Sequence, residues 1–152
     1  MNMDNRAYEG SAVDWGLDPL FWTSVKLFVG DLHHVLLDSS ESVFFIGNKH
    51  VARAVEVVGV VVSADTRSPK MTMYNVDDGT GVILCVVFST PEEQTDPDTR
   101  TIYQLGTTVR VEGRLSTFRD ERQLVVRNVR AVDPNEEALG WLERLQLRKH
   151  II

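Results

Sequence analysis

The sequence of 152 residues contains a single cysteine, Cys85, and no long apolar run. One cysteine cannot form an internal disulfide, and Cys85 lies inside an apolar segment, so we expect a buried, inert thiol in a reducing compartment. The apolar stretches are too short to cross a bilayer, and the first ten residues are polar, unlike a signal peptide. These absences disfavour secretion and membrane insertion.

Residue patterns typical of catalysis and metal binding are also missing. The four histidines do not alternate with cysteines or carboxylates at the spacing of metal ligands. The sequence has no phosphate-binding loop, nucleophile elbow or dinucleotide fingerprint. Asp77 and Asp78 are adjacent, so on a strand they would point to opposite faces, and a turn explains them better than acid–base chemistry. We therefore predict no catalytic residues, no metal and no cofactor.

The segment Tyr74–Phe88 predicts a hairpin at the centre of the core. Asp78-Gly79 is a strong signal for a tight turn, because glycine adopts positive φ without steric cost. Either Gly79 or Gly81 can occupy that position. The run Val82–Phe88 is apolar without alternation, as expected for a strand that is covered on both faces or closed into a small barrel.

Further strand patterns flank this hairpin. Val51–Ser63 is rich in β-branched residues, and Gly59 in its middle indicates a bend or bulge. A loop at Asp65–Pro69 precedes the hairpin, and a polar loop follows it. A fourth strand opens at Gly106, and a fifth follows the charged turn Arg119–Arg122. Five strands with a crossover between the third and fourth predict an all-β, five-stranded Greek-key barrel of the OB type. An SH3-like or other small barrel is the alternative.

Two helices should flank the barrel. Asp18 can cap an N-terminal helix that begins at Pro19 and runs to about Gly30, and a C-terminal helix begins at Pro134 and reaches about Lys149. A short strand is expected at 43–46. With 43% hydrophobic and 25% charged residues, the composition fits one ordinary domain. We expect a flexible start at residues 1–14 and a single domain over 15–152.

Charge is unevenly distributed along the chain. The formal net charge is -6 and the pI about 5.2, which argues against a freestanding nucleic-acid binder. Between Thr107 and Arg130, however, six arginines outnumber three acidic residues. This segment is either a solvated strand face whose arginines serve packing and pairing or a stripe that faces phosphates.

Several segments together resemble a known family. They are Trp15-Gly16-Leu17-Asp18-Pro19, Val57–Val61, Tyr74–Cys85, Val109–Gly113 and Thr117–Arg122. In their order and spacing they are similar to the N-terminal OB domain of the Stn subunit of the CST telomere complex. The turn Asp77–Gly81 also suits the related middle subunit of replication protein A. Animal and fungal Stn proteins continue into winged-helix domains, so the chain resembles the short plant form or an excised domain.

The resemblance implies a non-enzymatic subunit of a single-stranded telomeric DNA-binding complex in the nucleus, at chromosome ends. The implied partners are a Ten-like small OB protein, joined through paired terminal helices, a Ctc-like large subunit, and DNA polymerase alpha-primase for C-strand fill-in. A replication protein A-like subunit, or a protein-interaction module without DNA contact, is the alternative.

A single-strand binding site needs aromatic rings that stack on bases beside arginines that contact phosphates. Phe88 ends the third strand and Phe118 enters the loop after the fourth, and the matching positions in the Stn family lie on the proposed DNA-binding face. Each ring could instead belong to the core or the barrel mouth. The candidate nucleic-acid-binding residues are Tyr74, Phe88, Arg114, Phe118, Arg119 and Arg122.

The predicted C-terminal helix carries an apolar stripe. Ala138, Leu142 and Leu145 recur at helical spacing, and Trp141 lies beside them. Such a stripe either packs on its own barrel or docks against a partner. By the resemblance, these four residues are the candidate contacts with the Ten-like protein.

Overall fold

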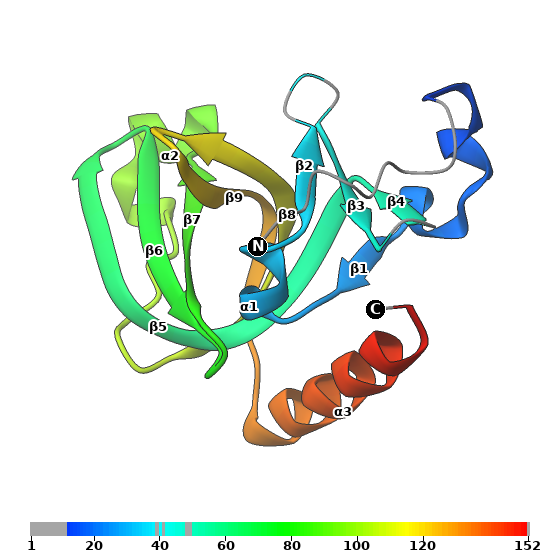
Figure 1. Ribbon diagram of the computed structural model, residues 1–152. Helices are drawn as coiled ribbons and strands as arrows, with labels where there is room; N and C mark the ends of the chain where they lie inside the picture. Colours follow the sequence, from blue (N-terminus) through cyan, green and yellow to red (C-terminus); the bar gives the residue numbers. More distant parts are fainter. Residues whose placement is uncertain (1–11, 39, 41, 48–49, 152) are drawn as a thin grey trace.

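The computed structural model describes residues 12–38, 40, 42–47 and 50–151. Five strands coil into a barrel (Figure 1). They are β5 (Ala54–Ser68), β6 (Met71–Asp77), β7 (Val82–Phe88), β8 (Thr108–Phe118) and β9 (Glu121–Ala131). Their order is β5-β6-β7-β9-β8, and β8 pairs back with β5, which closes the barrel. Only β7 and β9 pair in parallel within this barrel. The predicted five-stranded OB barrel is confirmed.

Strand β5 bends so that it serves both sides of the barrel. Its first half pairs with β8 over Val55–Val60, and its second half pairs with β6 from Val60 onward. At Gly59 a Cβ atom would lie 2.6 Å from the backbone oxygen of Asp77, so only glycine permits this close crossing. The loop predicted at Asp65–Pro69 is wrong in part, because β5 continues to Ser68 and pairs there with Met71.

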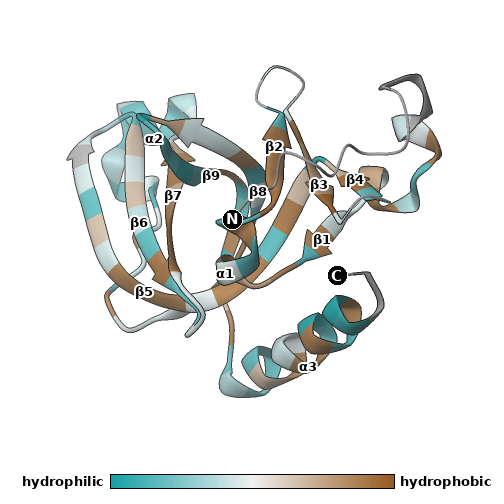
Figure 2. Ribbon diagram, in the orientation of Figure 1, coloured by the Kyte–Doolittle hydropathy of each residue, from teal (hydrophilic) through white to brown (hydrophobic). Residues whose placement is uncertain are grey.

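The barrel interior is filled by the inward side chains of all five strands. In Figure 2 the apolar strand β7 is brown. Cys85 of this strand is 1% exposed, and burial raises the pKa of its thiol to about 12. This matches the expected inert thiol. Core residues from the strands include Val55, Val57, Val61, Val76, Ile83, Val111 and Leu124.

The β6–β7 turn holds a short helix, α1 (Val29–Leu32), against the barrel. The Asp78 carboxylate is buried, and it accepts hydrogen bonds from the backbone N–H of Val29 at 2.8 Å and of Thr80 at 2.9 Å. Gly79 has a φ of 88°, as the predicted tight turn requires. The adjacent aspartates are therefore explained by turn formation and by binding to the start of α1.

The N-terminal helix predicted over 19–30 is interrupted. A 3-10 helix, η2 (Pro19–Trp22), begins with Asp18 as its cap, as predicted, but the strand β1 (Ser24–Lys26) follows it. β1 pairs in parallel with Ala54–Glu56 of β5. Pairing with a long strand overrides the helical pattern, and the chain returns to a helix only at α1.

A second, smaller sheet lies beside the barrel. It consists of β2 (Leu36–Asp38), β3 (Val43–Ile46) and β4 (His50–Ala52), so the short strand expected at 43–46 is confirmed. The long strand predicted from Val51 breaks at Arg53, between β4 and β5. A 3-10 helix, η1 (Ala12–Leu17), covers this sheet, with the Trp15 and Phe45 ring centroids 5.8 Å apart. The predicted flexible start lies largely outside the described residues.

The remaining elements are helical. A short helix α2 (Pro91–Thr95) and a 3-10 helix η3 (Pro97–Thr99) replace the polar loop after β7. The C-terminal helix α3 (Pro134–Ile151) lies below the barrel in Figure 1, beside β1. No helix among the described residues is long and apolar enough to cross a membrane.

Candidate nucleic-acid and partner interfaces

Helix α3 binds the barrel through polar groups. Arg144 is 2% exposed, and its guanidinium donates to the backbone oxygens of Leu27 at 3.1 Å and Glu56 at 2.9 Å. It also donates to the backbone oxygen of Gly140 within α3 at 3.0 Å. Burial lowers the pKa of Arg144, and the Glu56 carboxylate, 3.7 Å away, opposes that shift. The buried arginine thus anchors the middle of the helix.

Ion pairs hold the helix on either side of this anchor. Glu143 pairs with Lys26 of β1, and this bond lowers the pKa of Glu143. Arg148 pairs with Asp31 of α1 at 3.1 Å. Nearer the start of α3, Glu136 accepts from Arg130 at 2.9 Å. The barrel-facing side of α3 is therefore fixed by specific charged contacts along most of its length.

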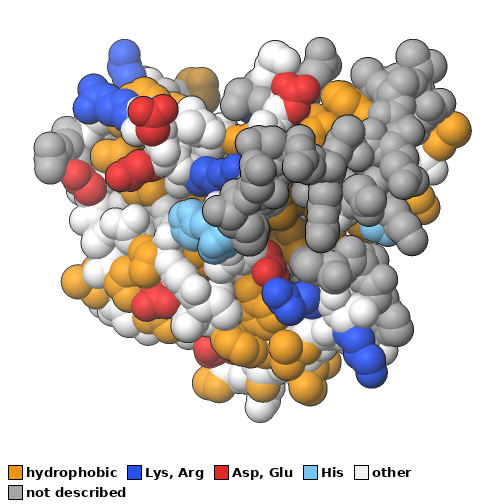
Figure 3. Space-filling model, viewed as in Figure 1, with side chains coloured by type: hydrophobic (Ala, Val, Ile, Leu, Met, Phe, Trp, Pro, Cys, Tyr) orange, Lys and Arg blue, Asp and Glu red, His pale blue; other side chains and the backbone are white. Residues whose placement is uncertain are grey.

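The opposite side of α3 is apolar and exposed. Leu139, Leu142 and Leu145 are 57%, 64% and 50% exposed, and Ala138 is also exposed. At 100° per residue these four positions share one face of the helix. Hydrophobic side chains gather at the bottom of the molecule, over α3, in Figure 3. We call Ala138, Leu139, Leu142 and Leu145 the outer stripe.

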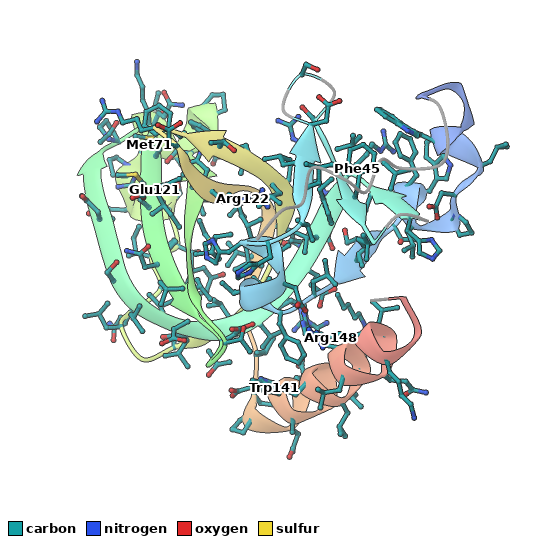
Figure 4. The ribbon with its side chains drawn as sticks, in the orientation of Figure 1. Phe45, Met71, Glu121, Arg122, Trp141 and Arg148 are labelled. Carbon is teal, nitrogen blue, oxygen red and sulfur yellow. The ribbon has the colours of Figure 1, made fainter. Side chains whose placement is uncertain are left out.

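At 100° per residue Trp141, which is labelled on α3 in Figure 4, lies between the outer stripe and Arg144, at the border between the two sides of the helix. It is half-buried, and its ring centroid lies 4.7 Å from that of Phe28. The Trp141 ring also covers Gly79 of the β6–β7 turn. Its main contacts are thus with its own barrel. Of the two alternatives that the sequence leaves open for the helix, packing on the barrel or docking against a partner, Trp141 follows the first.

The β8–β9 hairpin displays an aromatic ring and an arginine together. Arg119 and Asp120 form the turn, with positive φ values of 53° and 64°. Phe118 is 58% exposed, and the Arg119 guanidinium carbon lies 5.2 Å from its ring centroid. Arg114 is exposed on the same strand, and the alternating burial of β8 places it on the outer face. This hairpin can offer a stacking surface and positive charge together.

Phe88 is also exposed, at 60%, and pairs with Met71 at the far end of β6 and β7. In the parallel pairing of β7 with β9, Val86 lies opposite Val125, so Phe88 lies beyond this residue pair, toward the C-terminal ends of both strands. Phe118 pairs with Glu121 at the start of β9, so the two rings lie at opposite ends of the paired strands. The two rings therefore do not form one cluster. A single strand that crosses the face between them could contact both, because OB folds bind about 4 to 16 nucleotides.

One of the predicted nucleic-acid contacts needs correction, and another has a structural role. Tyr74 points into the barrel and is 3% exposed; burial raises the pKa of its hydroxyl, which accepts a hydrogen bond from the Tyr103 N–H at 3.1 Å. It cannot stack on a base. Arg122 is half-buried, and desolvation lowers the pKa of its guanidinium, which donates to the backbone oxygen of Leu32 at 2.7 Å (Figure 4). This bond ties α1 to β9 and gives Arg122 a structural role, and its predicted phosphate contact stays a prediction.

Some arginines are paired with carboxylates and others are not. This difference decides which arginines serve packing and pairing and which can face phosphates. Arg110, Arg127, Arg130, Arg144 and Arg148 each form an ion pair with a carboxylate. Among the described residues, no carboxylate pairs with Arg53, Arg114 or Arg119, and all three are exposed. The first group serves the fold. The second is available to phosphates.

Two features escaped the sequence analysis. One is the anchor Arg144, which could have been suspected only from an arginine at barrel-facing helical spacing. The other is a cluster in which the Arg53 guanidinium carbon lies 4.3 Å from the Phe21 ring and 4.8 Å from the Trp22 ring. Phe21 lies inside the helix that the sequence predicts from Pro19 to about Gly30, and the predicted strand over Val51–Ser63 contains no break at Arg53. Among the described residues, no three His, Cys, Asp or Glu side chains form a metal-binding group.

Comparison with known proteins agrees with the barrel and its surfaces. A family model described as "OB-fold nucleic acid binding domain" matches residues 55–132, which cover the barrel strands. The Arabidopsis thaliana protein named CST complex subunit STN1 is 34% identical over 145 residues, which are 82% of the chain and 89% of that relative. The chain belongs to the STN1 family of CST complex subunits.

Other STN1 proteins and structures agree with this assignment. The chain is 32% identical to human STN1 over 136 residues, but it spans only 36% of the length of that protein, and 40% of rat STN1. One chain of the crystal structure of the S. pombe Stn1-ten1 complex superposes with a TM-score of 0.70 at 26% identity, covering 84% of this chain and 92% of that one. A chain of a replication protein A heterotrimer bound to ssDNA shares the fold, with a TM-score of 0.68 and 22% identity. The chain therefore has the OB fold that STN1 proteins share with this replication protein A chain.

Proposed function

We propose that the chain is a non-enzymatic assembly subunit of a telomeric single-stranded DNA-binding complex in the nucleus, at chromosome ends. The observation that carries this proposal is the exposed outer stripe of α3. A helix on a globular domain usually turns its apolar side to the core. Here the helix is fixed by Arg144 and its ion pairs, and the outer stripe faces away from the barrel.

The partner of the outer stripe would be a Ten-like small OB protein that presents a helix of its own. An S. pombe relative of this chain was crystallised as a Stn1-ten1 complex. Exposed leucines at helical spacing suit helix-to-helix packing, in which fully desolvated apolar anchors contribute most of the affinity. A Ctc-like large subunit would complete the heterotrimer. Recruitment of DNA polymerase alpha-primase for C-strand fill-in is the role that we assign to the assembled complex.

The DNA would cross the outer face of the barrel between Phe88 and the β8–β9 hairpin. Phe118 and Arg119 supply a ring and a cation in contact, and Arg114 adds a second unpaired charge on the same strand. The net charge of -6 opposes binding by the isolated chain, so the assembled complex is the proper binding unit.

Titration of the complex with a fluorescent single-stranded oligonucleotide at low salt tests this face. Because a stacked base contributes about 1 to 3 kcal/mol, we expect Phe118→Ala with Arg119→Ala to raise Kd at least tenfold. The matched control is Ile102→Ala, which truncates an apolar side chain that is 41% exposed and lies away from the hairpin. Equal affinity of wild-type and hairpin-variant complexes, with both correctly assembled, would remove the hairpin from the DNA site.

A further inference from the structure

The cluster of Phe21, Trp22 and Arg53 lies outside the five-stranded barrel, yet it has the composition of a stacking site. Trp22 is 65% exposed, although its indole N–H donates to the backbone oxygen of Gly16 at 2.8 Å. Arg53 lies over both rings, and its Nε–H donates to the backbone oxygen of Phe21 at 3.1 Å. These bonds fix an exposed indole and a guanidinium together, so little conformational entropy is lost when either binds a ligand.

Strand register connects this cluster to the β8–β9 hairpin. The pairing of β5 with β8 ends at Val55 and Gly113, so the backbones of Arg53 and Arg114 both lie within two residues of this end of the ladder. Arg114 and Phe118 both occupy the outer face of β8, four residues apart, or about 13 Å at strand spacing. The outer face of β8 thus leads from Phe118 and Arg119 to Arg114, and the backbone of Arg114 lies at the end of the ladder where Arg53 precedes β5.

Charge along this path favours a polyanion. Arg53, Arg114 and Arg119 are the exposed arginines without a carboxylate partner among the described residues, and all three lie on the path. The acids nearby are Asp18, which is buried and accepts from the backbone N–H groups of Leu20 and Val51, Glu112, which Arg127 neutralises at 2.6 Å, and Asp120 with Glu121 in the hairpin. Each end of the path also has an exposed ring in contact with an arginine.

We propose that a single nucleic-acid strand bound at the β8–β9 hairpin continues along the outer face of β8 and stacks a base on Trp22, with Arg53 and Arg114 contacting its phosphates. This second stacking station lies outside the five-stranded barrel. It rests on the proposed DNA function and extends it, because it makes affinity depend on strand length. A short oligonucleotide reaches only the hairpin, whereas a longer one reaches both stations.

The test compares two oligodeoxythymidines, of about 4 and about 16 nucleotides, on the assembled complex. We expect Trp22→Ala and Arg53→Ala each to weaken binding of the longer strand by about tenfold and to leave the shorter strand unchanged. Arg53→Ala should also reduce the slope of log K against log salt by about 0.7, as loss of one phosphate contact on a single strand requires. Trp22→Phe keeps a ring and should retain most of the affinity, and Leu17→Ala, at an 81% exposed position, is the matched control.

Photo-crosslinking gives a second measurement that does not depend on a folded variant. An oligonucleotide with 5-iodouracil near one end should crosslink to the Trp22 peptide of the wild-type complex. If Phe118→Ala weakens both strands while Trp22→Ala and Arg53→Ala weaken neither, the second station is overturned and the hairpin site stands. If none of these variants changes affinity, the proposed DNA face fails as a whole. If Trp22→Ala or Arg53→Ala disrupts subunit assembly but leaves DNA affinity unchanged, the cluster is a protein contact and the inference is also overturned.

Discussion

The two sides of helix α3 differ in a way that separates folding from assembly. The inner side carries Arg144, Glu143 and Arg148, each bonded to the barrel, to β1 or to α1, and Leu147, which packs against the core, whereas the outer side carries three leucines that are at least half exposed. Hydrogen bonds are directional, and apolar contacts are not. Polar anchors therefore fix the orientation of the helix before a partner binds, and the apolar surface remains free for that partner.

The largest effect on the inner side is expected from Arg144→Leu. The substitution removes the arginine donor of the buried Leu27 backbone oxygen, one of the two donors of the Glu56 backbone oxygen, and one of the two cations beside the Glu56 carboxylate, which keeps Arg110 at 2.9 Å. We therefore expect the free energy of unfolding to fall by about 2 to 4 kcal/mol. Urea unfolding followed by circular dichroism measures it. Arg148→Leu removes an arginine whose side chain is 52% exposed and should cost less than about 1 kcal/mol. Equal losses for the two variants would contradict the anchor role.

A smaller loss is expected at the border of the two sides. Trp141→Ala removes a half-buried ring that packs on Phe28 and covers Gly79, which should lower the free energy of unfolding by about 2 kcal/mol. Leu139→Ala, on the outer stripe, should change it by less than about 0.5 kcal/mol. Calorimetry of the two variants measures both losses. If Trp141→Ala does not change the free energy of unfolding, Trp141 belongs to the outer side of α3.

The smallest effect concerns the pair between Glu143 and Lys26, and it depends on pH. The hydrogen bond from Lys26 lowers the pKa of Glu143 below its usual 4.5, so the pair stabilises the fold above that pH and is lost as pH falls through the folded pKa. Both side chains are over a third exposed, so we expect Glu143→Gln to cost only about 0.5 kcal/mol at pH 7. Thermal melts from pH 7 to pH 3 should show the variant and wild type converging. A constant difference across this range would mean that packing, and not charge, links the two residues.

The barrel could be read from the sequence because its signals are local. The β-branched run with Gly59 in its middle, the Asp78-Gly79 turn and the apolar run Val82–Phe88 each describe one strand or turn, and the structure confirms them. The predicted helix over 19–30 failed for the opposite reason. The parallel pairing of β1 with β5 is a contact between distant segments, and no pattern within 19–30 shows it.

The candidate sites show the same difference between local patterns and contacts of distant segments. Exposure of Phe118, Arg119, Leu142 and Leu145 follows from strand and helix periodicity. The inward orientation of Tyr74 depends on the register of β6, and the bond of Arg122 to Leu32 joins residues that lie 90 positions apart. Which arginines are paired was likewise settled by tertiary contacts, because net charge cannot distinguish a paired arginine from a free one.

The most direct test of the account is co-expression of the chain with a Ten-like partner, comparing wild type with Leu142→Asp plus Leu145→Asp by size-exclusion chromatography. Because the stripe is exposed, the lone variant should melt within about 2 °C of wild type, while two charges placed in an apolar interface should abolish the complex. Leu17→Asp, an equal change at an 81% exposed position, should leave the complex intact. A stable complex formed by the double variant, or unfolding of the lone variant, would contradict the claim that the outer stripe exists for a partner.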